Sequence, residues 1–147
     1  MKEKIFEAGL NELEDICKFL LEILKTEGIV LLEGDLAAGK TTLVKAFARY
    51  LHLDVSKVSS PTFSIMNEYE DKIRHYDIYQ KGINGFLQSG LLETLGEKDR
   101  YYFIEWADEE FETMLKNMGF DYVKVVIETK EKKRIYKVNV DAYTQSR

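Results

Sequence analysis

The sequence predicts an α/β fold, a three-layer sandwich whose parallel core strands are extended by antiparallel strands and a C-terminal hairpin. An apolar, β-branched run at 29–32 is followed by a glycine-bounded loop and by a segment, 42–51, whose apolar residues recur at helical spacing. Two hairpin-like segments follow, at 65–79 and 122–140. A strand–loop–helix unit followed by hairpins is typical of a parallel core with antiparallel additions.

The composition fits one domain spanning residues 1–147. Hydrophobic residues make up 45% of the chain and charged residues 32%, as in ordinary soluble domains. The formal net charge of −5 argues against a nonspecific nucleic-acid binder. The single cysteine, Cys17, cannot form an internal disulfide, and we find neither a secretory signal nor an apolar run of membrane-spanning length. We therefore expect a cytoplasmic protein with no membrane partner.

The first elements are a strand and an amphipathic helix. Residues 4–7 predict a short edge strand, and Asn11 precedes Glu14 by the spacing of a capping box. The apolar face of the helix that follows consists of Leu13, Ile16, Cys17, Leu20 and Leu24. We expect Cys17 to be buried and the helix to end near Gly28.

The loop after the strand at 29–32 fits G-x-x-x-x-G-K-[ST], the pattern of a phosphate-binding P-loop. It consists of Gly34, Asp35, Leu36, Ala37, Ala38, Gly39, Lys40 and Thr41, with Thr42 next. Backbone N–H groups of such a loop turn towards a phosphate chain, and the helix behind it adds the positive end of its dipole. We expect Lys40 to reach the β- and γ-phosphates of a nucleotide and the Thr41 hydroxyl to ligate Mg²⁺. A strand–helix turn with an accidental lysine is the alternative, but the flanking strand and helix favour a P-loop NTPase-like fold.

Two acids end predicted strands. The hairpin over 65–79 places Asp77 near the end of its second strand, and the apolar run at 101–104 ends at Glu105, followed by Trp106. An apolar strand that ends in an acid is typical of the Walker B position, where the carboxylate holds Mg²⁺. A solvated strand-end carboxylate is the alternative for both acids.

The remaining segments carry weaker signals. The loop at 58–65 contains the only proline, Pro61, among several hydroxyl side chains; its composition favours a stiff connection over a nucleotide-sensing switch. Residues 80–99 predict a loop with one or two short helices. Asp108 begins a helix closed by Gly119, and the hairpin after it is expected to add to the sheet edge. The turn of this hairpin is basic and typical of a solvated tip; its cations are Lys130, Lys132, Lys133 and Arg134.

Four separated segments, in this order, strongly resemble the TsaE (YjeE) family of small bacterial P-loop ATPases. They are residues 34–42, Ser60-Pro61-Thr62-Phe63, His75-Tyr76-Asp77-Ile78-Tyr79 and Ile104-Glu105-Trp106. Many NTPases share the first segment, whereas the combination is specific. With its flanking elements the resemblance covers nearly the whole chain.

The resemblance implies a role in making threonylcarbamoyladenosine on tRNA, beside the anticodon. Family members act with the TsaB–TsaD pair, which performs the transfer, while hydrolysis of ATP by the TsaE protein supports repeated turnover. It therefore implies ATP and Mg²⁺ as ligands and the TsaB–TsaD heterodimer as partner, with tRNA contacted only indirectly. Stoichiometry and direct tRNA contact stay open.

By motif match, Lys40 and Thr41 carry over as phosphate and Mg²⁺ ligands, and Glu105 as the second metal carboxylate. Asp77 carries over as a metal-site or water-orienting acid. Lys40 and Asp77 are thus the implied catalytic residues. Which of the two acids positions the attacking water is left open.

The resemblance also covers positions around the nucleotide. It places Thr62 in the switch-like loop, Trp106 near the nucleotide and Arg134 in contact with it. Ala37 departs from the family, which usually has glycine there, and Gln80 stands where the family commonly has arginine. Neither departure removes a phosphate or metal ligand.

Three other functions compete with this interpretation. A small-molecule kinase usually needs a basic lid, but the five arginines, at 49, 74, 100, 134 and 147, include no adjacent pair. Members of the GTPase family carry an Asn-Lys-x-Asp segment that recognises guanine, and this sequence contains no such segment. A nucleotide-dependent binding module without hydrolysis stays open beside a slow, partner-activated ATPase.

Overall fold

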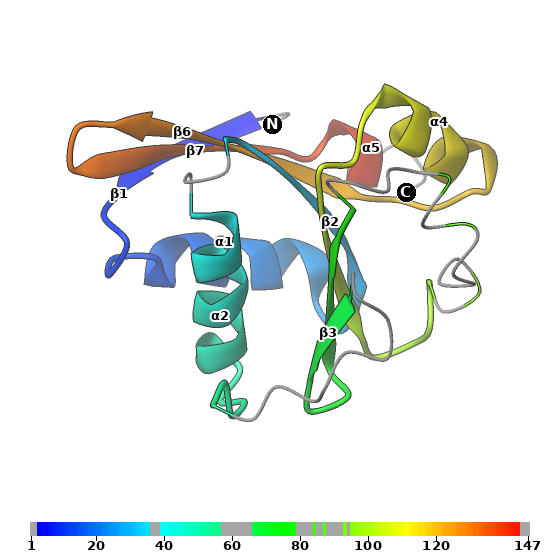
Figure 1. The fold of residues 1–147 in the computed structure, drawn as a ribbon, viewed down its shortest axis with the longest axis horizontal. Helices are drawn as coiled ribbons and strands as arrows, with labels where there is room; N and C mark the ends of the chain where they lie inside the picture. The colour runs from blue at the N-terminus through cyan, green and yellow to red at the C-terminus, as the bar shows by residue number, and fades with distance from the viewer. Residues whose placement is uncertain are drawn as a thin grey trace.

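The strands of this chain assemble into one seven-stranded mixed sheet, in the order β1-β7-β6-β2-β5-β4-β3 (Figure 1). The computed structural model describes residues 3–35, 39–56, 66–78 and 95–144, together with Asn84, Leu87 and Glu93. The strands are β1 (Glu3–Ala8), β2 (Gly28–Glu33), β3 (Met66–Tyr69), β4 (Ile73–Asp77), β5 (Tyr101–Glu105), β6 (Val123–Lys130) and β7 (Lys133–Asn139). The helices among the described residues are α1 (Glu14–Leu24), α2 (Lys40–Tyr50), α4 (Glu109–Asn117) and α5 (Asp141–Thr144).

The predicted parallel core is confirmed. Strands β4, β5, β2 and β6 pair in parallel, and β3, β7 and β1 are antiparallel additions. The edge strand predicted at residues 4–7 is confirmed as β1, and the C-terminal hairpin extends the parallel core as predicted, since β6 pairs with β2. The hairpin does not itself form the edge of the sheet, because β1 pairs with β7 outside it. The pattern of alternation could not reveal this, since an edge strand and an inner antiparallel strand with one solvated face look alike in sequence.

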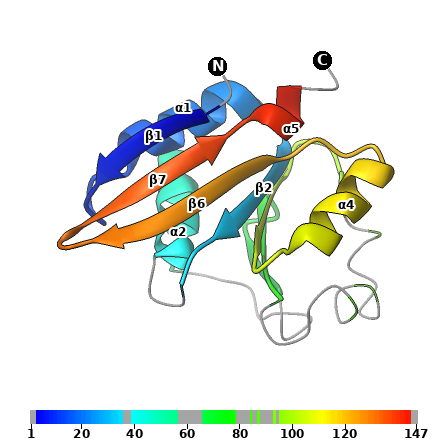
Figure 2. The same ribbon diagram turned by 90° about the horizontal axis from the view of Figure 1, so that it is seen from above.

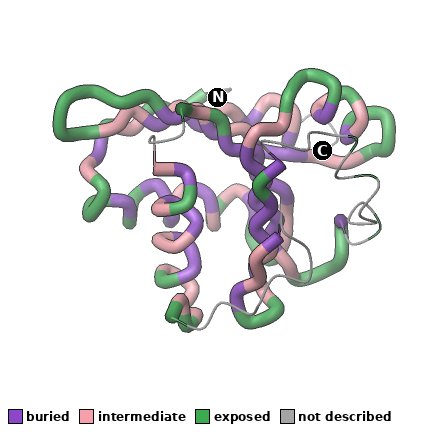
Figure 3. Tube along the Cα trace, viewed as in Figure 1, coloured by how far each residue is buried: buried purple, intermediate pink, exposed green. Residues whose placement is uncertain are grey.

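Helices cover both faces of the sheet, which gives the three layers that the sequence predicts (Figure 2). On one face α1 and α2 contribute Leu20 and Phe47 to a core that also contains Phe103 and Tyr136 from the strands. On the other face, α4 buries Phe111 and Leu115 against a second core. The central strands are buried from both sides (Figure 3), and β5 is buried along its whole length. This burial fixes the strand ends that carry the candidate site.

The two ends of α1 differ from the expected ones. The predicted capping box at Asn11 is absent: Leu13 occupies the N-cap and makes no side-chain capping bond. The helix ends at Leu24, while Gly28 opens β2. A Cβ on Gly28 would lie 2.5 Å from Leu24 Cδ2, so this glycine allows close packing of helix and strand and does not close the helix.

Other local expectations are confirmed. Asp108 caps α4, its Oδ1 accepting a 2.9 Å hydrogen bond from the Phe111 backbone N–H. Cys17 is buried. Among the described residues, no helix combines the length and the apolar character needed to cross a membrane.

Candidate active site

The candidate site lies where the parallel strands end and α2 begins. Strand β2 ends at Glu33, Gly34 and Asp35 follow, and Lys40 is the first residue of α2. Gly39 occupies the helix N-cap at φ 99°, a left-handed conformation, and a Cβ there would lie 3.1 Å from Leu10 Cδ2. The left-handed conformation is the reason that glycine is favoured at this end of the loop, whereas the contact with Leu10 would need only a small shift of that side chain.

Lys40 is buried, with 3% of its surface exposed. Its Nζ donates a 2.7 Å hydrogen bond to the Gly34 carbonyl oxygen and lies 3.6 Å from the centroid of the Trp106 ring. Trp106 directly follows β5 and has φ 68°, which is uncommon for a residue with a side chain. Backbone outliers of this kind concentrate at functional sites, and this one accompanies the contact between the indole and the P-loop lysine.

Burial lowers the pKa of Lys40, while the nearby carboxylates of Glu105, Asp77 and Asp35 act to raise it. The ammonium group thus lies in a partly desolvated position with three acids around it. In such surroundings its attraction to an anion is stronger than it would be in water.

Glu105 connects the sheet to α2. The Thr41 hydroxyl donates to Glu105 Oε2 at 3.2 Å, and the same oxygen is hydrogen-bonded to His75 Nε2 from β4. Glu105 and His75 are each 4% exposed. His75 was not among the predicted site residues, although it lies two residues before Asp77 and therefore on the same face of its strand.

Asp77 lies beside Glu105, since the parallel register of β4 and β5 pairs these two residues. Unlike Glu105, Asp77 is exposed. The expectation that both acids end adjacent strands next to the P-loop helix is met.

A cavity of about 250 Å³ opens at this place. Its lining consists of Leu10, Gly39, Lys40, Thr41, Thr42, Glu105 and Arg134. The β6–β7 hairpin therefore brings Arg134 to the cavity at the start of α2, and its contact with a nucleotide stays a prediction. Leu10, from the β1–α1 connection, was not predicted. A large apolar side chain that stays 42% exposed gave no periodic signal in the sequence.

The donors present fit Mg²⁺. Thr41 and Glu105 bring a hydroxyl and a carboxylate oxygen together, and Asp77 adds a second carboxylate nearby. Within the described part of the chain, no group of three or more His, Cys, Asp or Glu residues has the arrangement of a metal cage. Mg²⁺ is commonly held by one or two carboxylates together with water and substrate phosphates, so a cage is not required.

Several predicted positions lie outside the described residues. They are Leu36, Ala37 and Ala38 in the loop, Thr62, and Gln80.

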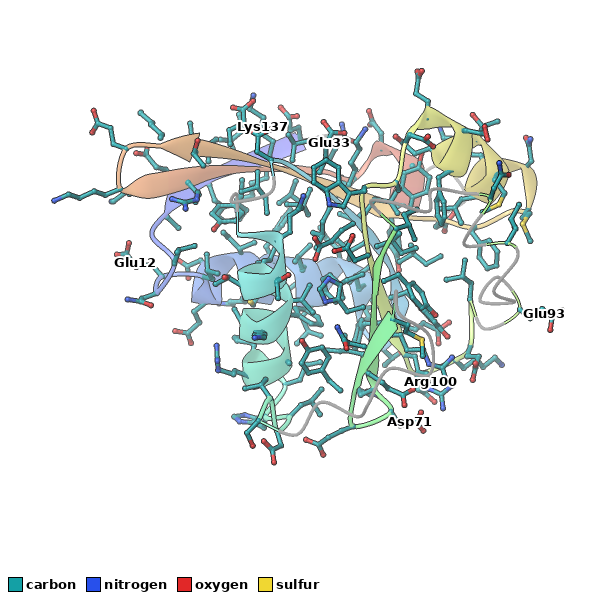
Figure 4. All side chains as sticks on the ribbon, in the orientation of Figure 1. Glu12, Glu33, Asp71, Glu93, Arg100 and Lys137 are labelled. Carbon is teal, nitrogen blue, oxygen red and sulfur yellow. The ribbon has the colours of Figure 1, made fainter. Side chains whose placement is uncertain are left out.

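The described arginines other than Arg134 lie away from the cavity. Arg74 pairs with Glu68 and Glu97, at 3.0 and 2.8 Å. Arg100 pairs with Asp71 at 2.9 Å, and Figure 4 shows this pair at the end of the sheet opposite the start of α2. Arg49 lies near the other end of α2, because it follows Lys40 by nine positions, which corresponds to roughly 13 Å along the helix axis.

Comparison with known proteins identifies the family. Residues 8–136 match the family model described as "Threonylcarbamoyl adenosine biosynthesis protein TsaE". A protein of that description from Aquifex aeolicus is 32% identical over 146 residues, which is 93% of this chain and 97% of the relative. One from Bacillus subtilis is 32% identical over 127 residues, covering 76% of this chain and 75% of the relative.

A solved structure supports the fold independently. The crystal structure of Bacillus subtilis YdiB superposes with a TM-score of 0.64 at 24% identity, covering 99% of this chain and 90% of that one. The match of the family model extends from the end of β1 into β7 and includes the loop, both acids and Arg134. The chain belongs to the TsaE family of tRNA threonylcarbamoyladenosine biosynthesis proteins.

Proposed function

We propose that this chain is a Mg²⁺-dependent ATPase whose hydrolysis supports repeated turnover of the TsaB–TsaD transferase pair. The hydrogen bond between Thr41 and Glu105 carries the proposal, because it joins the P-loop helix to the end of β5 across 64 positions of sequence. A P-loop hydroxyl beside a strand-end carboxylate is the arrangement with which NTPases hold the metal of a metal–nucleotide complex.

Lys40 provides charge for the phosphates. Its Nζ contacts the Gly34 carbonyl and the Trp106 ring, and these contacts direct the ammonium group within the site. The N-terminus of α2, which no side chain of its N-cap residue caps, adds backbone N–H donors at the same place. Donors fixed before the substrate arrives stabilise developing negative charge without reorganisation.

The two acids take different roles in this proposal. Thr41 and Glu105 would hold Mg²⁺, which supplies charge neutralisation and orientation of the phosphates when bound. Glu105 is buried and already accepts two hydrogen bonds, whereas Asp77 is exposed on the neighbouring strand. Asp77 therefore has the access needed to orient an attacking water molecule.

We further propose that hydrolysis by the isolated chain is slow. Arginine charge that stabilises the transition state is a common part of fast NTPases. Of the arginines in the described ranges only Arg134 lines the cavity, while Arg74 and Arg100 are held in ion pairs elsewhere, so the described residues place no cluster of arginines there. The TsaB–TsaD pair would complete the site, and tRNA would be reached only through that pair, with the chain acting as one domain over 1–147.

The test is ATP hydrolysis by the purified chain alone and with purified TsaB–TsaD, each with Mg²⁺ and with EDTA. We expect slow hydrolysis alone, stimulation by the pair and loss of activity in EDTA. A parallel screen of small phosphoryl acceptors separates an ATPase from a kinase. Transfer of phosphate to an acceptor, without stimulation by the pair, would overturn the proposal.

A further inference from the structure

Three polar or charged side chains are buried among the described residues: Lys40, His75 and Glu105. Lys40 and Glu105 belong to the site proposed above. His75 contacts that site through its hydrogen bond to Glu105 and does not line the cavity. Burying a polar group costs free energy unless it is hydrogen-bonded, so the reason for a histidine at this core position lies in that bond.

The tautomer of the ring is assigned from the partner of Nε2. Nε2 faces Oε2 of Glu105. Because an ionised carboxylate oxygen can only accept, the tautomer with hydrogen on Nε2 is the one that donates to Glu105. The other ring nitrogen, Nδ1, is buried and has no hydrogen-bond partner within the described residues. The interaction with Glu105 thus accounts for all the hydrogen bonding of the ring that the structure describes.

The bond constrains the carboxylate of Glu105 in a defined way. Both His75 Nε2 and Thr41 Oγ1 use Oε2, and among the described residues no donor contacts Oε1. The two donors approach from different elements, β4 and the first turn of α2. The donor from β4 belongs to the buried sheet, so its position does not depend on the P-loop.

We propose that His75 is a positioning residue for Mg²⁺ binding: it holds Glu105 so that the carboxylate is oriented towards the metal before the nucleotide arrives. This inference rests on the proposed function, because it assumes that Glu105 binds Mg²⁺. Partners that orient a metal ligand typically change metal affinity about 10- to 100-fold when they are replaced.

Replacement of His75 by glutamine or by asparagine tests this role, because the two amides place their nitrogen at different distances from the backbone. The side-chain nitrogen of glutamine reaches about as far as Nε2 of histidine, whereas that of asparagine reaches only about as far as Nδ1. His75→Gln therefore keeps a donor within reach of Glu105, and His75→Asn does not. Tyr76→Phe is the matched control, since Tyr76 is a buried neighbour on β4 that packs on the opposite face of the sheet.

The experiment is calorimetric titration of each variant with a non-hydrolysable ATP analogue, in EDTA and over a series of Mg²⁺ concentrations. Affinity in EDTA should be unchanged in all variants. In His75→Asn the Mg²⁺ concentration for half-maximal enhancement of binding should rise about tenfold or more. His75→Gln should respond much more like the wild type, and Tyr76→Phe should match it.

A double variant adds a second readout. In a Glu105→Gln background, His75→Asn should cause no further change in the Mg²⁺ response, because the two residues act as one unit. Equal Mg²⁺ responses of His75→Gln and His75→Asn, or equal losses in EDTA and in Mg²⁺, would show a structural role and overturn the inference. If His75→Asn does not fold, the His75→Gln variant decides by itself: a weakened Mg²⁺ response in that variant overturns the inference. A wild-type chain whose analogue binding ignores Mg²⁺ would instead contradict the proposed function.

Discussion

Lys40 makes two different contacts, with a carbonyl oxygen at 2.7 Å and with an aromatic ring at 3.6 Å. Neither contact neutralises the ammonium charge, and burial lowers the pKa of Lys40 by penalising that charge. A phosphate group that enters the cavity therefore supplies what these contacts lack. The residue is poised for an anion, and its removal should affect nucleotide binding more than folding.

We expect Lys40→Ala to weaken ATP binding about 10- to 100-fold, the effect of losing a charge-assisted hydrogen bond. Lys45→Ala, on the same helix, removes the same charge outside the cavity lining and should bind ATP like the wild type. Calorimetric titration measures both affinities, and thermal unfolding verifies that both variants fold. Equal affinities in the two variants would reject the assignment of Lys40.

Cys17 illustrates the opposite case, a buried group with no role in the site. Burial raises the pKa of its thiol to about 12, and Glu14 contributes in the same direction. The folded state thus holds the thiol proton more tightly than the unfolded state does. The contribution of this thiol to the free energy of unfolding is therefore constant below about pH 9, and it decreases as pH rises towards 12.

At pH 8 we therefore expect Cys17 to react very slowly with a thiol reagent, because only about one thiol in 10⁴ is ionised in the native state. Unfolding in urea should make the reaction fast. The measurement is the rate of reaction with a chromogenic disulfide in buffer and in urea. A fast reaction of the native chain would show that the thiol is accessible.

At the scale of the elements, local signals in the sequence were reliable and long-range ones were not. The P-loop unit and the acids at 77 and 105 were predictable because each depends on a short pattern: an apolar run, a glycine-bounded loop, a strand-end carboxylate. The neighbour of the C-terminal hairpin was not, since the pairing of β1 with β7 joins opposite ends of the chain. The role of His75 was equally hidden, because its partner Glu105 lies 30 positions away.

The parallel pairing of β4 and β5 leads to a prediction for the two acids that end them. Asp77→Asn and Glu105→Gln keep the side-chain shapes and remove one charge each, so they should lower partner-stimulated hydrolysis by roughly 100-fold. Melting temperatures should change little. Glu128→Gln, at a surface ion pair with Lys137, is the control and should keep wild-type activity. An acid variant with unchanged hydrolysis would identify that acid as a structural residue.

At the scale of the whole molecule, we propose that a partner surface completes the site. The cavity at the start of α2 is open, and the buried residues Glu105 and Lys40 are part of its lining. The other charged clusters serve the fold: Arg74 and Arg100 hold the far end of the sheet, and Lys124 bridges Glu33 and Glu112 at 3.2 and 2.9 Å. A partner that docks over the cavity would exclude water from the phosphates and supply charge, the two features that fast hydrolysis requires.

Docking over the cavity would couple the binding of nucleotide to the binding of the partner. If ATP strengthens binding to TsaB–TsaD, the pair must strengthen ATP binding by the same factor, because the coupling free energy belongs to both equilibria. Typical couplings correspond to about 5- to 150-fold in affinity.

We expect the affinity for TsaB–TsaD to differ between the ATP-analogue, ADP and nucleotide-free states, and the affinity for the analogue to change by the matching factor when the pair is present. At nucleotide concentrations that saturate the wild type but lie below the weakened affinity of Lys40→Ala, this variant should bind the pair with nearly the same affinity in all three conditions. Equal partner affinities for the wild type in all three states, together with full hydrolysis by the chain alone, would show that nucleotide does not control the complex.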